Sequence, residues 1–223
     1  MKIIIINGSH RKNGSTALIL NGLSEELKKR DDVDVQIVNV ADLSLNYCIG
    51  GSKCYKTGKC IHKDDLEALS ATISTADGII FGSPTYASNV SAQMKTIIDR
   101  GHFVMEQLLS GKYVINVATY ENYGGTDTAK ILNRITSYSG ANITGTLVYR
   151  KIYINNSDKK EKLNKHIQKT ANKLYRDIKT KHRYTFQSIK HLIIFNIGIK
   201  PFVIKNKTEY SGVLNYWKSK NII

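Results

Sequence analysis

An uninterrupted apolar segment at the start of the chain most constrains the fold. Residues 3–6 are four consecutive isoleucines, Asn7 and Gly8 end the run, and a helical pattern begins near Ser15. A strand that is apolar on both faces belongs inside a parallel sheet, because only there are both faces covered. Ligands bind such sheets beyond the carboxyl ends of the strands, so the polar turn that follows is a candidate binding loop.

This turn is rich in groups that bind phosphate. It combines backbone N–H groups at a helix start with hydroxyls and cations, supplied by Ser9, Arg11, Lys12, Ser15 and Thr16. Two common nucleotide motifs are excluded, because His10 interrupts a G-x-G-x-x-G pattern and Ser15 stands where a P-loop has lysine. The pattern favours a monophosphate pocket; the alternative is a capped helix start without a ligand, since caps use the same residue types.

Strand-like and helix-like segments alternate along the first 150 residues. Further strands are expected at residues 33–40, 78–83, 112–119 and 142–149, with helices between them. This alternation predicts an α/β fold, a doubly wound five-stranded parallel sheet with right-handed crossovers. Loops 84–89 and 119–125 then join the first turn at one edge of the sheet.

The basic charge of the protein is confined to its last third. The net charge is +15, but residues 1–149 carry 15 Lys or Arg against 14 Asp or Glu, whereas residues 150–223 carry 18 against 4. The region with the candidate binding loops is nearly neutral, which argues against nucleic acid as the main partner.

Composition also bears on the compartment. The chain begins without a signal-peptide pattern and has no apolar run approaching the roughly 18 residues of a membrane span. Its three cysteines are an odd number within one segment, which argues against a disulfide framework. We therefore expect a cytoplasmic protein with reduced thiols.

Three segments in the right order carry a family resemblance. They are the loop 8–16, the segment 82–86 with the helix start that follows it, and a cysteine segment that ends in Asp64-Asp65. Over about residues 1 to 150, the chain resembles the NADPH-dependent FMN reductase and iron-sulfur flavoprotein group of flavodoxin-like proteins. The resemblance implies the strand order 2-1-3-4-5 and FMN as cofactor.

The resemblance also implies which residues hold the cofactor. The FMN phosphate would be bound by Ser9, Arg11, Asn13, Gly14, Ser15 and Thr16. The flavin ring would be lined by Pro84, Thr85, Tyr86, Ala87, Ser88, Asn89, Thr119, Tyr120, Gly124 and Gly125. No catalytic side chain is expected, because the flavin carries the chemistry. Tyr86 and Tyr120 would stack on the ring; alternatively they are ordinary surface-loop tyrosines.

The cysteine segment departs from the pattern of the iron-sulfur members. Their spacing resembles C-x2-C-x2-C-x(4 to 7)-C, and here Cys48, Cys54 and Cys60 fit it while Gly51 occupies the second position. Three thiolates cannot complete a four-cysteine site, so we expect no iron-sulfur cluster and no bound metal. A zinc site formed by the three cysteines and His62 is the alternative.

The C-terminal part divides into a helix and an unusual extension. Residues 157–181 have apolar residues at helical spacing, which predicts a last helix covering the sheet. We expect a flavodoxin-like domain over residues 1–182 and a basic, apolar-rich extension over 183–223. Three interpretations of this extension compete: packing on its own domain or a second subunit, contact with an anionic membrane surface, and binding of nucleic acid.

Together these features predict an FMN-dependent oxidoreductase. It would transfer hydride or electrons from NAD(P)H or a protein donor to a small acceptor such as a quinone, a flavin or a nitro compound. No nicotinamide fingerprint is visible, and none is required if the donor binds only transiently. The alternatives are a non-enzymatic electron carrier and a membrane-associated flavin protein; a homodimer or higher homo-oligomer is expected.

Overall fold

The computed structural model describes residues 1–151 and 157–223. The strands are β1 (Lys2–Asn7), β2 (Asp34–Asn39), β3 (Gly78–Tyr86), β4 (Asn89–Val90), β5 (Tyr113–Tyr120) and β6 (Asn142–Arg150). The helices of the first part are α1 (Ser15–Lys28), a 3-10 turn η1 (Val40–Asp42), α2 (Lys53–Thr57), α3 (Leu66–Ser74), α4 (Ala92–Arg100) and α5 (Gly125–Tyr138). Those of the C-terminal part are α7 (Ser157–Lys179), α8 (Thr185–Ile193), a π-helical segment η2 (Ile194–Ile199), α9 (Lys200–Lys205) and α10 (Ser211–Ser219).

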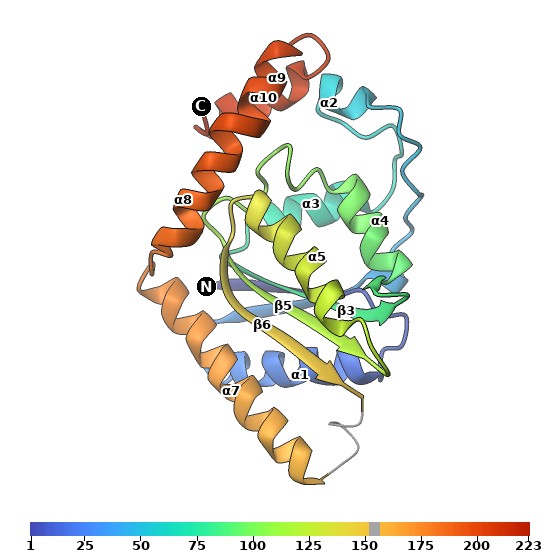
Figure 1. The fold of residues 1–223 in the computed structure, drawn as a ribbon, viewed down its shortest axis with the longest axis vertical. Coiled ribbons are helices and arrows are strands. Elements are labelled where there is room, and N and C mark those ends of the chain that lie inside the picture. Colours follow the sequence, from blue (N-terminus) through green and yellow to red (C-terminus); the bar gives the residue numbers. More distant parts are fainter. Residues whose placement is uncertain (152–156) are drawn as a thin grey trace.

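Five parallel strands form the sheet in the order β2-β1-β3-β5-β6 (Figure 1). If only the parallel strands are counted along the chain, this is the order 2-1-3-4-5. The predicted doubly wound parallel sheet is confirmed. β1 lies between β2 and β3, with Ile5 opposite both Ile37 and Ile80, so its backbone is paired on both sides.

Both faces of β1 are covered by helices. Ile3 and Ile5 pack into a core formed with α1 and α7, whereas Ile4 and Ile6 pack into a second core formed with α3, α4 and α5. Figure 1 shows these two groups of helices on opposite sides of the sheet. All four isoleucines are fully buried. Complete burial of such a side chain contributes about 1.5–3 kcal/mol, so this strand anchors both layers.

The end of β3 differs from the sequence prediction. Residues 84–89 are expected to form a loop, but residues 84–86 continue the strand. Asn89 and Val90 form the short antiparallel strand β4, in which Val90 pairs with Thr85. Ala87 and Ser88 form the two-residue turn with φ of 48° and 58°. Such hairpin turns need positive φ at both central residues and usually contain Asn or Gly, so this sequence gave no hairpin signal.

The C-terminal helices pack on the same chain around a small third core. Phe195, Val203, Val213 and Trp217 are buried there, and the indole Nε1 of Trp217 donates a hydrogen bond to the Met105 carbonyl at 2.8 Å. One interpretation of this extension is contact with an anionic membrane surface; Trp217 is fully buried, so its ring is not available for such a contact. Across the two described ranges, no helix is long and apolar enough to cross a bilayer.

Replacing the chain's single tryptophan tests how firmly the extension is attached. Trp217→Ala removes a fully buried side chain and a hydrogen bond, so the free energy of unfolding is expected to fall by about 3–5 kcal/mol. Urea unfolding followed by circular dichroism measures this change. Phe186→Ala is the matched control, because Phe186 is 91% exposed, and it should change stability by less than about 0.5 kcal/mol. Equal midpoints for wild type and Trp217→Ala would contradict this packing.

Candidate functional site

A cavity of about 330 Å³ lies beyond the carboxyl ends of β1, β3 and β5, within the size range of ligand sites. Three separate chain segments meet there, as the sheet topology predicts. Its lining residues are Ser9, Arg11, Asn13, Gly14, Ser15, Thr16, Leu18, Pro84, Thr85, Tyr86, Thr119, Tyr120, Glu121 and Lys151. Leu18, Glu121 and Lys151 were not predicted; the last two form an ion pair at 3.1 Å, and exposed charged residues give no sequence signal for a site.

The turn after β1 is held by its own side chains. The Ser9 backbone N–H donates to Asn7 Oδ1 at 3.0 Å, and the Arg11 N–H donates to Ser9 Oγ at 3.1 Å. Asn7 and Ser9 are both buried. Because these bonds fix the turn locally, the Arg11 side chain and the start of α1 are placed at the cavity by short-range structure.

The first turn of α1 meets the cavity with its backbone N–H groups uncapped. Gly14 is the N-cap residue and provides no side-chain acceptor, so the N–H groups of Ser15 and Thr16 have no capping partner. The Thr16 hydroxyl shares a hydrogen bond of 2.7 Å with the Thr119 hydroxyl. A helix start with positive dipole, free N–H groups and hydroxyls is suited to an anion.

Buried hydroxyls connect the first and second loops. Ser91 caps α4 by accepting from the Met94 N–H at 3.1 Å and donates to the Gly8 carbonyl at 2.6 Å. Its own N–H donates to Ser83 Oγ at 2.9 Å. A Cβ on Gly8 would lie 2.8 Å from Met94 Cβ, so glycine is needed for this close approach.

Five predicted site residues lie outside the cavity lining: Ala87, Ser88, Asn89, Gly124 and Gly125. Gly124 has φ of 80°, and a Cβ there would lie 2.8 Å from Ser88 Cα. A Cβ on Gly125 would lie 2.3 Å from the Tyr120 ring. These glycines therefore allow the β3–β4 turn and the Tyr120 ring to pack against the start of α5.

Two features of the second loop bear on ligand binding. The Thr85 hydroxyl is buried beside the cavity and has no hydrogen-bond partner within the described chain. A buried hydroxyl without a partner carries a free-energy cost, so a polar ligand atom could satisfy it. The neighbouring Tyr86 ring is 56% exposed and free to contact a ligand.

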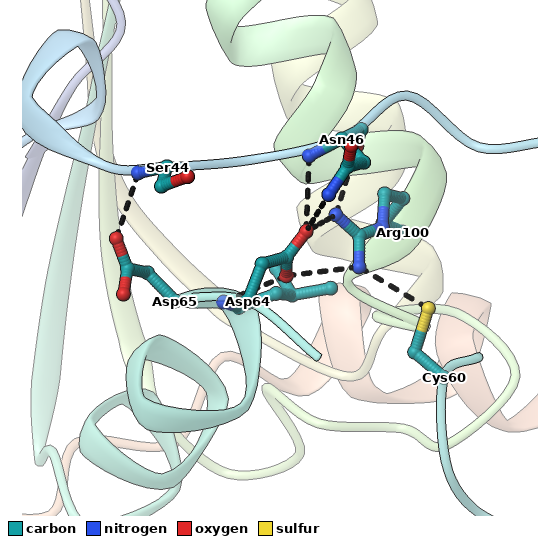
Figure 2. A network of polar contacts seen from close by, with 7 residues as sticks. Ser44, Asn46, Cys60, Asp64, Asp65 and Arg100 are labelled. Carbon is teal, nitrogen blue, oxygen red and sulfur yellow. Dashed lines mark hydrogen bonds and ion pairs between the residues drawn. The ribbon is translucent and has the colours of Figure 1, made fainter. Parts of the chain in front are cut away.

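A buried ion pair fixes the cysteine segment to α4 (Figure 2). Arg100 Nη1 and Nη2 donate to the two Asp64 carboxylate oxygens at 2.6 and 3.0 Å, and both side chains are almost completely buried. Asp64 also accepts from the Asn46 N–H at 2.9 Å, and Nη2 donates to Cys60 Sγ at 3.2 Å. The hydrogen bonds from Arg100 hold the pKa of Asp64 well below its ordinary value.

The three thiols are free and line a separate small cavity of about 80 Å³ together with Gly51 and His62. Burial raises the pKa of the Cys54 thiol, and the other two thiols add to the shift. Within residues 1–151 and 157–223, no group of three or more His, Cys, Asp or Glu side chains is placed to hold a metal ion.

Asp64 gives the fold a dependence on pH. Its lowered pKa in the folded state stabilises the protein above the unfolded pKa of about 4, and this contribution is lost as pH falls below that value. Asp64→Asn leaves Arg100 buried and unpaired, so it should lower the free energy of unfolding by about 3–5 kcal/mol at pH 7. The difference from wild type should shrink in urea unfolding at pH 3.

The control for this measurement is Asp99→Asn, which breaks an exposed pair with Lys95. Exposed pairs contribute at most about 1 kcal/mol, so the control should behave nearly as wild type at both pH values. A difference between Asp64→Asn and wild type that stays constant from pH 7 to pH 3 would contradict the assignment.

Comparison with known proteins agrees with this geometry. The family model described as NADPH-dependent FMN reductase matches residues 1–155. An iron-sulfur flavoprotein of Clostridioides difficile (strain 630) is 35% identical over 226 residues, which cover 100% of both chains. The solved structure of an NADH:FMN oxidoreductase in its apo form covers 76% of this chain and 88% of its own, with 19% identity and a TM-score of 0.59. That of a flavodoxin from the domain Archaea covers 78% and 99%, with 15% identity and a TM-score of 0.52, so the fold is flavodoxin-like. The chain belongs to the NADPH-dependent FMN reductase family.

Proposed function

We propose that this protein binds FMN in the cavity between the loops after β1, β3 and β5. Bound there, FMN would pass hydride or electrons from NADPH or NADH to a small acceptor such as a quinone, a flavin or a nitro compound. The observation that carries the proposal is the meeting of three predicted loops in one cavity. The family match supports it, since the matched model describes FMN reductases.

The donor set of the cavity fits the two ends of FMN. The phosphate would be held by Arg11 and by the uncapped start of α1, where Ser15 and Thr16 add hydroxyls. The ring would lie against Pro84, Thr85 and Tyr86 from β3 and Thr119 and Tyr120 from β5.

When bound, FMN supplies the redox chemistry, so this chain's residues need only bind and orient it. The unpartnered Thr85 hydroxyl would donate to a polar edge of the ring, and the Tyr86 ring would cover one face. Gly124 and Gly125 would act indirectly, by allowing the Ser88 turn and the Tyr120 ring to approach.

Variants of two adjacent basic residues, Arg11 and Lys12, test the proposed FMN site. Arg11 lines the cavity, whereas its neighbour Lys12 does not and instead pairs with Asp42 at 2.6 Å. Arg11→Ala should weaken FMN binding by about tenfold or more, because it removes a charge-assisted contact to the phosphate. Lys12→Ala should stay within about twofold of wild type. Fluorescence titration of FMN measures both; equal losses, or a wild-type protein that does not bind FMN, would contradict the proposal.

The electron donor separates an enzyme from an electron carrier. If the protein is a reductase, NADPH or NADH should reduce the bound flavin in stopped-flow measurements at rates of about 1 s⁻¹ or faster, typical of enzyme turnover. The comparison is reduction of the same preparation by a reduced ferredoxin-like protein. Reduction by that protein alone, with neither nucleotide effective, would reject the reductase and support a carrier.

We also propose that this chain holds no iron-sulfur cluster, although a full-length relative is named an iron-sulfur flavoprotein. Only three cysteines are present, and Gly51 stands at the fourth position of the cluster pattern. The Cys60 sulfur already accepts a hydrogen bond from the buried guanidinium of Arg100.

Restoring the fourth cysteine tests this proposal. A Cβ on Gly51 would meet only Ile49 side-chain atoms at 3.9 Å, so Gly51→Cys is sterically acceptable. After anaerobic reconstitution, Gly51→Cys should acquire iron and sulfide, while wild type should lack stoichiometric iron by metal analysis. Ser52→Cys adds a fourth thiol outside the pattern and should match wild type. Stoichiometric iron in wild-type protein would overturn the proposal.

A further inference from the structure

A second, larger cavity lies at the opposite edge of the sheet. Its volume is about 510 Å³, and its open wall is formed by the end of α3, the segment before β5 and the C-terminal helices. Lys112, which lines it, immediately precedes β5, whereas Thr119 and Tyr120 of the first cavity end that strand. Eight strand residues span about 25 Å, so the two cavities are distinct sites.

Three lysines from three different elements line this cavity. Lys112 precedes β5, Lys200 begins α9, and Lys220 follows α10, while no lining residue is acidic. Within the described residues, neither Lys200 nor Lys220 forms an ion pair. The lining therefore carries three lysines and no carboxylate, and the carboxylate that acts on Lys112, that of Asp77, lies outside the lining.

Lys112 is the fixed member of this group. Its ammonium donates to the carbonyls of Ser74 at 2.8 Å and Ala76 at 2.6 Å. Burial lowers the pKa of Lys112, the charge of Asp77 opposes this shift, and the nearby charge of Lys220 adds to it. Lys112 and Lys220 are thus close enough to repel one another, and the lining holds no carboxylate. An anion bound between them would lower this repulsion.

The remaining wall is apolar and aromatic. Phe195 is buried and its ring stacks on His191, with centroids 6.0 Å apart and planes 20° apart. Burial lowers the pKa of His191, which favours its neutral form at pH 7. His191 Nε2 is hydrogen-bonded to Gln107 Oε1 at 2.5 Å, so the wall is fixed in place.

We propose that this cavity binds a small organic phosphate with an aromatic body. The phosphate groups would lie between Lys112, Lys200 and Lys220, and the body would contact the partly buried rings of His191 and Tyr216. The assignment rests on two features that occur together in this cavity. Three lysines favour a phosphate, and a concave wall with aromatic residues favours an organic body attached to it. This site is separate from the proposed flavin site and requires no redox step.

The test uses the full chain saturated with FMN, so that the first cavity is filled. Isothermal titration compares three magnesium-free probes at low ionic strength: ATP, inorganic pyrophosphate and adenosine. ATP should bind most tightly, pyrophosphate more weakly and adenosine weakest, because only ATP offers both phosphates and a ring. If neither ATP nor pyrophosphate binds saturably, the proposal is overturned.

Lysine variants separate the cavity from general attraction to a basic surface. Lys200→Gln and Lys220→Gln should each weaken ATP binding by about tenfold, the loss expected for one charge-assisted contact. Lys218→Gln is the matched control, since Lys218 lies in the last turn of α10, two residues before Lys220, is exposed as Lys220 is, and does not line the cavity. An equal loss in Lys218→Gln, or no loss in Lys220→Gln, overturns the proposal.

Two further readouts keep this result independent of folding and of the flavin site. Bound ATP should protect Lys200 and Lys220 from acetylation, measured by mass spectrometry, and leave Lys218 reactive. Arg11→Ala, which alters the first cavity, should leave ATP binding unchanged; ATP binding lost in Arg11→Ala would place the nucleotide in the flavin cavity and overturn the second site.

Discussion

Burial of β1 on both faces is the constraint on which the rest of the structure depends. Because side chains alternate along a strand, Ile3 and Ile5 require cover on one face and Ile4 and Ile6 on the other. Helices must therefore lie on both sides of the sheet, and crossover connections must link parallel strands. The carboxyl ends of β1, β3 and β5 consequently meet at one edge, where the first cavity forms.

Short-range and long-range hydrogen bonds hold the three loops of the first cavity together. Ser9 and Asn7 shape the first turn within a few residues of sequence. Ser91 then joins that turn to the second loop through the Gly8 carbonyl, 83 residues away, and Thr16 meets Thr119 across 103 residues. These contacts are buried, so each is stronger than it would be in water, and together they hold an edge built from three loops.

The C-terminal extension and the cysteine segment support each other. Tyr55 of α2 stacks on Tyr210 with ring centroids 5.1 Å apart, and a Cβ on Gly212 would lie 2.3 Å from the Gly58 nitrogen. The segment is held at its other end by the Arg100–Asp64 pair. This long loop stays largely exposed but is fixed at two points, and the extension forms part of the wall of the basic cavity at the opposite edge of the sheet.

The sequence by itself determined the parallel sheet, its order and most of the first cavity. The apolar runs and the polar turn at residues 9–16 are local features, so the sequence predicts them directly. The strand order follows from the family resemblance, which the binding loops carry. Only the tertiary structure decided the rest. The Ala87-Ser88 turn lacks its usual residues and forms because β4 finds a partner in β3. Lys112, Lys200 and Lys220 are ordinary surface lysines in the sequence and become one cationic group because packing of the extension brings distant segments together.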